Sequence, residues 1–220
     1  IKQELINSRV KITREILNLI RNTKHKPEVF ISGSAIGFYG NSKDQEFIET
    51  STPNKCFTHE VCNRWEIEAQ SAKDLTRVCL IRTGIVLSKD GGALKQMLPA
   101  FKLGLGGVMG EGSQWMSWIH IDDFVYAVQK IIEDKKISGP VNVVSPNPVT
   151  NKTFTKDLGN TLRRPVIMPM PGFLLRLIFG EMAKALLLQG QKVLPKKLLD
   201  SGFKFKYPEL TPALQNLLGK

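Results

Sequence analysis

The chain has 220 residues and a formal net charge of +11, from 31 basic and 20 acidic residues. Hydrophobic residues make up 42% and charged residues 23%, a balance typical of a globular protein with a substantial core. The most apolar stretch, residues 172–188, is interrupted by Arg176, Glu181 and Lys184, so we expect no membrane span. No secretory signal pattern is recognised, and the sequence predicts a cytoplasmic protein.

The positive charge is scattered along the sequence. It occurs in pairs such as Arg163–Arg164 and Lys196–Lys197, without a recognition-helix or basic-aromatic pattern. We therefore expect no nucleic-acid partner, and a phosphate-bearing small ligand remains an alternative reason for the charge.

Three cysteines without a disulfide spacing favour a reducing compartment. Cys56, His59 and Cys62 form C-x-x-H-x-x-C, but zinc usually needs a second pair of ligands, and none follows. The sequence predicts no metal site.

Apolar spacing predicts a helix from the first residues to about Arg21. Ile1 is not an initiator methionine and no capping signal precedes this helix, so we expect the chain to be the remainder of a longer protein. Short apolar runs then alternate with amphipathic segments, which predicts an α/β fold with a parallel sheet. The expected strands are 29–31, 77–82, 117–121, 141–144 and 166–168. The expected helices are 57–72, 93–103, one from about 124, 151–162, 173–188, and two that follow Pro195 and Thr211.

The glycine-rich stretch 104–123 lies between two helical patterns and contains two tryptophans, a histidine and two aspartates. Asp122 or Asp123 is the expected N-cap of the helix that follows. A glycine-rich loop beside aromatic residues at a strand end is typical of a small-molecule site in an α/β sheet. The alternative is a tight loop whose tryptophans belong to the core.

The order of these segments resembles the extended short-chain dehydrogenase/reductases. The sequence is most similar to an atypical subgroup of the NAD-dependent epimerase/dehydratase family, the putative nucleoside-diphosphate sugar epimerases. The resembling segments are SGSAIGFYG (32–40), CNRWE (62–66), RTGIVLSKDGGAL (82–94), GLGGVMGEGSQWMSWIHIDD (104–123), GPVNVVSP (139–146) and LPKKLLDSGFKFKYPEL (194–210).

This resemblance implies a Rossmann-like domain that binds NADP or NAD, with NADP favoured, and a smaller domain on the substrate side. Residues 1–90, joined by 117–146, would form the C-terminal half of the Rossmann domain; 91–116 and 147–220 would form the substrate side. The family's nucleotide fingerprint would lie before residue 1. Gly104, Gly107 and Gly110 reproduce its spacing, but a helix precedes them and a strand follows, the reverse of the order that pyrophosphate binding needs.

The family's usual catalytic set is a Ser, a Tyr and a Lys four residues after the Tyr. Ser34 matches the serine, but Thr58 and Cys62 stand where the Tyr and Lys are expected. Neither can replace that pair near neutral pH. Cys62 itself and His120 are the alternative acid or nucleophile candidates.

Two other Tyr-x-x-x-Lys spacings occur, and neither is placed as the family's pair requires. Tyr39 and Lys43 lie in a turn, and Tyr126 and Lys130 lie on a helix that carries no catalytic pair in the family.

The resemblance implies cofactor contacts at the ends of two strands, from Ser32, Gly33, Ser34, Arg82, Thr83 and Gly84. It implies substrate contacts from Tyr39, Gln114, Trp115 and Trp118. The sequence thus predicts an NAD(P)-dependent oxidoreductase or epimerase with a small-molecule substrate and a possible homodimer. Two alternatives are a non-catalytic NAD(P) sensor and a plain interaction protein.

Overall fold

In a computed structural model, the described part of the chain covers residues 2–167 and 189–219. Its centre is a parallel sheet in the order β1-β3-β7. The strands are β1 (Val29–Ala35), β3 (Arg77–Thr83) and β7 (Gly139–Val143). Because all three run the same way, their carboxyl ends meet at one edge. The predicted α/β class with a Rossmann-like parallel sheet is therefore confirmed.

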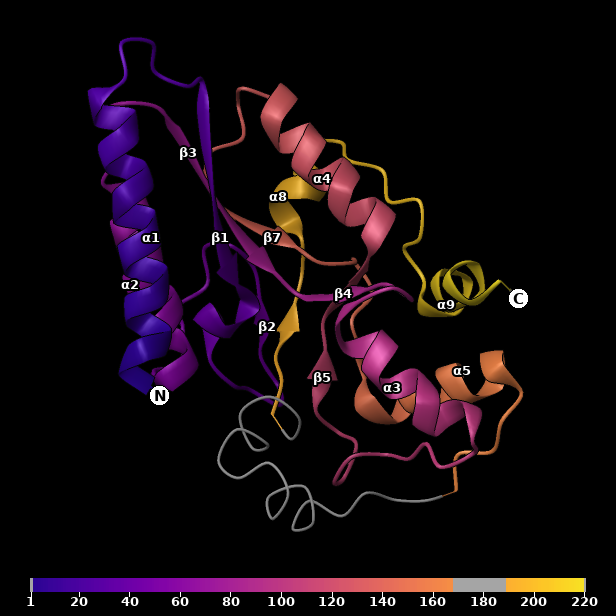
Figure 1. Ribbon diagram of the computed structural model, residues 1–220. Coiled ribbons are helices and arrows are strands. Elements are labelled where there is room, and N and C mark those ends of the chain that lie inside the picture. Colours follow the sequence, from indigo (N-terminus) through magenta and orange to yellow (C-terminus); the bar gives the residue numbers. More distant parts are fainter. Residues whose placement is uncertain (1, 168–188, 220) are drawn as a thin grey trace.

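Helices cover both faces of this sheet (Figure 1). On one face are α1 (Lys2–Asn22) and α2 (Phe57–Gln70), and on the other α4 (Ile121–Glu133) and α8 (Lys196–Asp200). Strand β3 contributes apolar side chains to both faces of the sheet. Leu80 packs against α1 and α2, and Cys79 packs against α4 and α8. This two-sided burial explains why the strand is a continuous apolar run.

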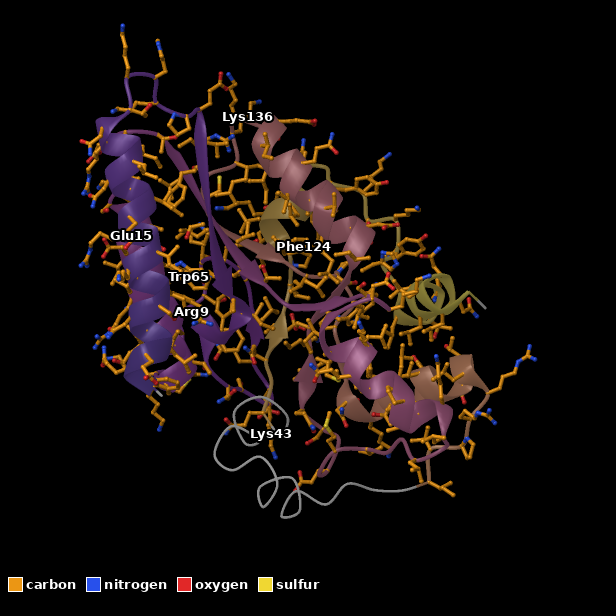
Figure 2. The ribbon with its side chains drawn as sticks, viewed as in Figure 1. Arg9, Glu15, Lys43, Trp65, Phe124 and Lys136 are labelled. Atoms are coloured by element: carbon orange, nitrogen blue, oxygen red, sulfur yellow. The ribbon has the colours of Figure 1, made fainter. Side chains whose placement is uncertain are left out.

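Helix α1 docks on α2 because its inward positions recur at helical spacing: Ile6, Thr13, Leu17 and Ile20 are buried. The Trp65 indole of α2 donates to Thr13 Oγ1 at 3.0 Å. The Arg9 guanidinium lies 5.8 Å from the Trp65 ring centroid (Figure 2). A mixed apolar and polar seam therefore holds the two helices together.

The remaining elements lie around the carboxyl edge of the sheet (Figure 1). The longer ones are α3 (Gly92–Lys102), α5 (Asn151–Leu162) and α9 (Leu210–Leu218). The short ones are η1 (Ile36–Tyr39), β2 (Glu46–Phe47), β4 (Ile85–Leu87), β5 (Trp115–Met116), β6 (Trp118–His120), β8 (Val149–Thr150) and β9 (Lys192–Val193). Strands β4 and β6 pair in parallel, as do β2 and β9, whereas β5 and β8 are antiparallel.

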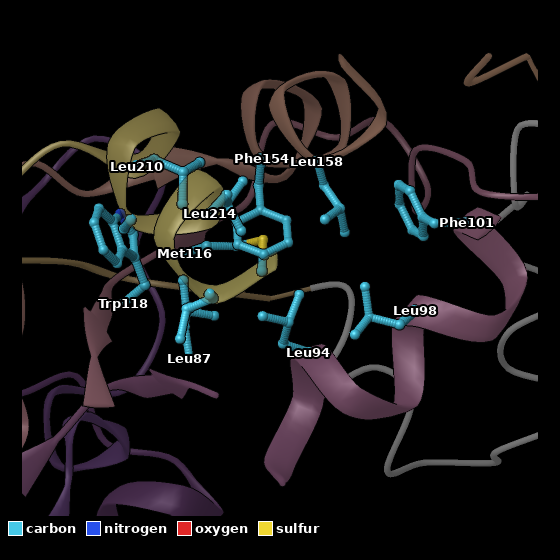
Figure 3. Close-up of a cluster of buried hydrophobic side chains, with 12 residues drawn as sticks. Leu87, Leu94, Leu98, Phe101, Met116, Trp118, Phe154, Leu158, Leu210 and Leu214 are labelled. Atoms are coloured by element: carbon cyan, nitrogen blue, oxygen red, sulfur yellow. The ribbon is translucent and has the colours of Figure 1, made fainter. Parts of the chain in front are cut away.

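A second apolar core joins α3, α5 and α9 (Figure 3). Its centre is Phe154, with Leu94 and Leu98 from α3 and Leu214 from α9 around it. Trp118 contributes to this core and is fully buried. Its indole Nε1 donates to the Asn147 carbonyl at 3.1 Å, which satisfies its one polar atom.

Two local expectations were wrong. The N-cap of α4 is His120, because its Nδ1 accepts from the Asp122 backbone N–H at 3.0 Å; Asp122 and Asp123 lie inside the first turn, beside the positive end of the helix. Residues 166–167 form no strand. The expected helix at 173–188 lies outside the described residues.

Candidate functional site

A buried polar network lies at the carboxyl edge of the sheet, and its centre is an ion pair. Arg82, one residue before the end of β3, donates to both carboxylate oxygens of Glu66 on α2, each at 2.8 Å. Both side chains are only 3% exposed. A buried guanidinium in an apolar strand requires such a bidentate partner, since an unpaired charge would be costly to desolvate.

Ser34, near the end of β1, is joined to this pair. Its hydroxyl donates to Glu66 Oε1 at 2.7 Å, so its proton points inward. The remaining lone pairs of Ser34 can only accept hydrogen bonds. Ser34 is therefore held as an acceptor by a carboxylate that Arg82 fixes in place.

Tyr39 forms the other side of the network. Its hydroxyl accepts from Arg82 Nη1 at 3.0 Å and donates to Asn142 Oδ1 at 2.7 Å. Burial raises the pKa of Tyr39 to about 12, although the nearby Arg82 charge opposes the shift. The phenol is thus neutral near pH 7, and its one proton is committed to Asn142.

Cys62 of α2 is buried and lies beside Ser34 of β1. Burial raises the pKa of its thiol to about 11. A nucleophilic cysteine needs the opposite shift, toward the thiolate. Thr58, one turn earlier, has its hydroxyl 3.1 Å from Cys56 Sγ.

His120 lies apart from this network, at the start of α4. While Nδ1 caps the helix, Nε2 lies 3.1 Å from Asn216 Oδ1 on α9. The ring packs against that of Tyr207 at a centroid distance of 4.0 Å, with the two planes tilted by 33°. The acceptor at Nδ1 implies a proton on Nε2, which is the neutral form. Burial lowers the pKa of His120, against the opposing charge of Asp122.

Two glycines at the strand ends have packing roles. A Cβ on Gly33 would lie 2.9 Å from the Trp65 ring, and one on Gly84 would lie 2.4 Å from the Ser117 carbonyl oxygen. Small size at both positions is therefore needed for neighbouring elements of this chain. Ser32 and Thr83, the other expected cofactor residues, lie on β1 and β3, Ser32 buried and Thr83 half-buried.

The expected substrate residues separate into three places. Tyr39 is in the buried network and Trp118 is in the second core. Trp115 is half-buried, donates to the Lys43 carbonyl at 2.9 Å and has the Lys192 ammonium 4.9 Å from its ring centroid. Gln114 donates to the Met109 carbonyl at 3.0 Å. The structure thus brings Ser34, Cys62, Arg82 and Tyr39 together, and it places His120, Gln114, Trp115 and Trp118 elsewhere.

The network contains residues that sequence analysis did not propose as site residues. Glu66 could have been found, because the charge of Arg82 in an apolar strand calls for a buried carboxylate. Asn142 and Glu49 gave no such signal: Asn142 Nδ2 donates to the Leu194 carbonyl at 2.9 Å, and Glu49 Oε1 accepts from the Asn142 and Lys197 N–H groups, each at 3.1 Å. These contacts join segments about 50 to 150 positions apart.

The C-x-x-H-x-x-C residues point to different partners. Cys56 contacts Thr58, His59 Nδ1 lies 2.7 Å from the Phe38 carbonyl, and Cys62 lies beside Ser34. Within residues 2–167 and 189–219, no group of three His, Cys, Asp or Glu side chains is placed to hold a metal ion. In that same part of the chain, no helix is long and apolar enough to cross a membrane.

Comparison with known proteins identifies the family of the chain. Residues 1–144 match the NAD dependent epimerase/dehydratase family, and residues 170–217 match a domain of unknown function, DUF1731. The chain belongs to the NAD-dependent epimerase/dehydratase family, which confirms the resemblance seen in the sequence.

Relatives in this family are similar over nearly the whole chain. The epimerase family protein SDR39U1 homolog of Arabidopsis thaliana, described as chloroplastic, is 41% identical over 99% of this chain and 63% of its own length. The epimerase family protein YfhF of Bacillus subtilis is 40% identical over 99% of this chain and 72% of its own length. The chain therefore spans between three fifths and three quarters of these two relatives.

Solved structures agree with this assignment. The human epimerase family protein SDR39U1, crystallised with NADPH, superposes with a TM-score of 0.95 at 32% identity, over 100% of this chain and 75% of its own. A nucleoside-diphosphate sugar epimerase from Corynebacterium glutamicum gives 0.80 at 35% identity, over 99% of this chain and 43% of its own.

Proposed function

We propose that the protein binds NADP(H) and acts as an oxidoreductase or epimerase on a small molecule, with a nucleotide sugar as one possible substrate. The observation that carries the proposal is the superposition on the human relative crystallised with NADPH. The parallel strands support it, since ligands of open α/β sheets bind outside the carboxyl ends of the strands. Ser32, Gly33, Ser34, Arg82, Thr83 and Gly84 remain the proposed cofactor contacts.

A fluorescence titration of the purified protein with NADPH, and in parallel with NADH, tests this proposal. Saturable binding at micromolar concentrations, tighter for NADPH, is the expected result. Absence of binding to either dinucleotide would overturn it.

The second candidate is an NADP(H) sensor without catalysis, and the candidate acids and bases favour it. Ser34 donates its proton to Glu66, Tyr39 and Cys62 are held in their neutral forms, and both ring nitrogens of His120 are engaged. The set Ser34, Cys62 and His120 remains the proposed catalytic one if turnover exists.

Two substitutions separate the candidates. Under the enzyme hypothesis, Ser34→Ala abolishes hydride exchange between NADPH and a panel of carbonyl substrates. Under the sensor hypothesis, the wild-type protein shows no turnover with the panel, although NADPH binds. His120→Asn serves as the second variant, because asparagine retains helix-capping ability.

We propose the domain division expected from the sequence. Residues 1–90 with 117–146 would form the nucleotide-binding part, and 91–116 with 147–220 the substrate part. The shared core of α3, α5 and α9 supports the second unit. Leu87 and Trp118, which belong to the first unit, pack in the same core, and we propose that the two units adjoin there. Tyr39, Gln114, Trp115 and Trp118 remain the proposed substrate-side residues.

We also propose a homodimer formed through α1. Its outward face exposes Ile12, Ile16 and Leu19, of which Leu19 is 71% exposed. An apolar stripe of this kind on a helix surface favours pairing with another apolar surface. Light scattering should give twice the monomer mass, and Leu19→Glu should halve it; a monomeric wild-type protein would contradict the proposal.

We propose the cytoplasm as the compartment. The three cysteines are free thiols, which supports a reducing environment. Fractionation of the source cells should place the protein with the cytosolic markers; recovery in an organelle fraction would contradict this.

A further inference from the structure

The segment 189–197, termed the crossing segment below, crosses the carboxyl edge of the sheet (Figure 1). Gln191 Nε2 donates to the Ile36 carbonyl, just past the end of β1, at 2.8 Å. Ser117 Oγ donates to the Gln191 carbonyl at 2.8 Å and accepts from the Val193 N–H at 3.0 Å. The crossing segment is thus bound to the end of β1 and to the residue before β6.

Asn142 binds the crossing segment at the end of β7. Its side-chain amide joins two systems: Nδ2 donates to the Leu194 carbonyl at 2.9 Å, and Oδ1 accepts from Tyr39 at 2.7 Å. Its backbone N–H donates to Glu49, whose carboxylate also accepts from Lys197 at 3.1 Å. One fully buried residue therefore connects the crossing segment to the network of Tyr39 and Arg82.

With the crossing segment in this position, Tyr39 and Asn142 are both 0% exposed. Val193 of the crossing segment packs with Tyr39, and Leu194 accepts a hydrogen bond from Asn142, so movement of the segment would expose both residues to a ligand at the strand ends. The chemistry of Asn142 suits a fastening residue, because a carboxamide offers a donor to one partner and an acceptor to the other at once.

We infer that Asn142 is a positioning residue that fastens the crossing segment over the carboxyl edge and so controls how fast a dinucleotide reaches it. The kinetic part rests on the proposed function. The fastening itself depends only on the contacts of Asn142, so the two can fail separately.

Asn142→Asp and Tyr39→Phe form a matched pair of variants. The first removes the Nδ2 donor to Leu194 and keeps an oxygen for Tyr39. The second removes the Tyr39 hydroxyl and keeps the bond to Leu194. Ser117→Ala is a further variant, which loosens the segment at another point without altering Asn142.

Hydrogen exchange followed by mass spectrometry, without cofactor, measures the fastening. Peptides covering 191–197 should exchange at least about fivefold faster in Asn142→Asp than in Tyr39→Phe, since one lost hydrogen bond lowers the local opening energy. Peptides of β1 and β3 should change little in Asn142→Asp. Equal exchange rates of 191–197 in the two variants, or a uniform rise in exchange rate across the sheet, would overturn the inference. If Asn142→Asp does not fold, Ser117→Ala takes its place, and the exchange rate of 191–197 in that variant is compared with that in Tyr39→Phe.

Stopped-flow fluorescence with NADPH measures access. The association rate constant for NADPH should rise several-fold over the wild-type value in Asn142→Asp and in Ser117→Ala. An unchanged rate constant alongside faster exchange would refute control of access by the segment. If NADPH binds to no variant and not to the wild type, the proposed function fails, and the exchange result still decides the fastening.

Discussion

Glu66 on α2 and Arg82 on β3 meet in a two-point ion pair whose donor–acceptor distances are both 2.8 Å. The Arg82 guanidinium also lies 3.4 Å from the Phe38 ring centroid, so its face and its edge are both occupied. This pair holds α2 to the sheet at the place where catalysis or cofactor binding is proposed.

Removing one member of the pair should destabilise the fold strongly. Arg82→Met leaves Glu66 and its bond from Ser34 in a buried site without a counter-charge, and a loss of about 3–5 kcal/mol in the free energy of unfolding is expected. The double variant Arg82→Met with Glu66→Leu should lose less than the single one. Urea denaturation of the wild type, the single variant and the double variant measures the free energy of unfolding. A value for Arg82→Met within about 1 kcal/mol of the wild type would contradict the prediction.

The network should also set an alkaline limit to stability. Burial raises the pKa of Cys62 from 9.0 to about 11 and that of Tyr39 from 10.0 to about 12. Both groups therefore hold their protons more tightly in the folded protein than in the unfolded chain. Their contribution is complete below pH 9.0 and is lost as the pH rises through the folded values.

Urea denaturation at a series of pH values between 8 and 12 should show the free energy of unfolding falling. Substituting either group should remove that group's part of the fall. The decline above about pH 10 should be shallower in Tyr39→Phe, and that from about pH 9 shallower in Cys62→Ala. A decline of the same slope in wild type and variants would assign it to other groups.

Protonation of His120 should make the free energy of unfolding fall at acid pH. Its pKa is lowered by burial, and protonation of Nδ1 would remove the cap on Asp122. Its contribution is therefore present above the ordinary value of 6.5 and is lost as the pH falls below it. Nuclear magnetic resonance titration of the ring protons gives the pKa directly. In His120→Asn, the part of the acid destabilisation that begins near 6.5 should disappear.

Glycine substitutions test the close packing at the strand ends. Gly84→Ala would place a Cβ 2.4 Å from a backbone oxygen that cannot turn aside, and an overpacking cost of about 1–3 kcal/mol or more is expected. Gly91→Ala is the matched control, since nothing lies within 4 Å of its Cβ position. Thermal melting of both variants should show a clear drop for the first alone; equal melting temperatures would mean that the backbone adapts.

Sequence patterns predicted the architecture well because strands and helices leave local signals. The run RVCLIR became β3, and α1 formed where the apolar spacing predicts a helix. The apolar stripe of α1 does not form its buried face, however: of the stripe only Ile20 is buried, whereas Ile12, Ile16 and Leu19 are exposed. The N-cap of α4 was wrong because an aspartate is the commoner cap, while here a histidine accepts the same N–H with its ring nitrogen.

The site was harder to foresee, since its members are joined by contacts between distant segments. The family resemblance pointed to Ser34 and Arg82, which lie near the ends of two strands. The proposed role of Asn142 depends on its contact with Leu194, 52 positions later in the chain, and no local sequence pattern encodes such a contact.

The three tryptophans occupy three different surroundings. Trp65 lies in the seam between α1 and α2 near Arg9, Trp115 lies beside Lys192 of the crossing segment, and Trp118 lies in the core of α3, α5 and α9. Each indole therefore emits from a separate part of the molecule. Replacing two of them with phenylalanine in turn would give single-fluorophore proteins, in which quenching reports independently on helix docking, on the crossing segment and on the second core.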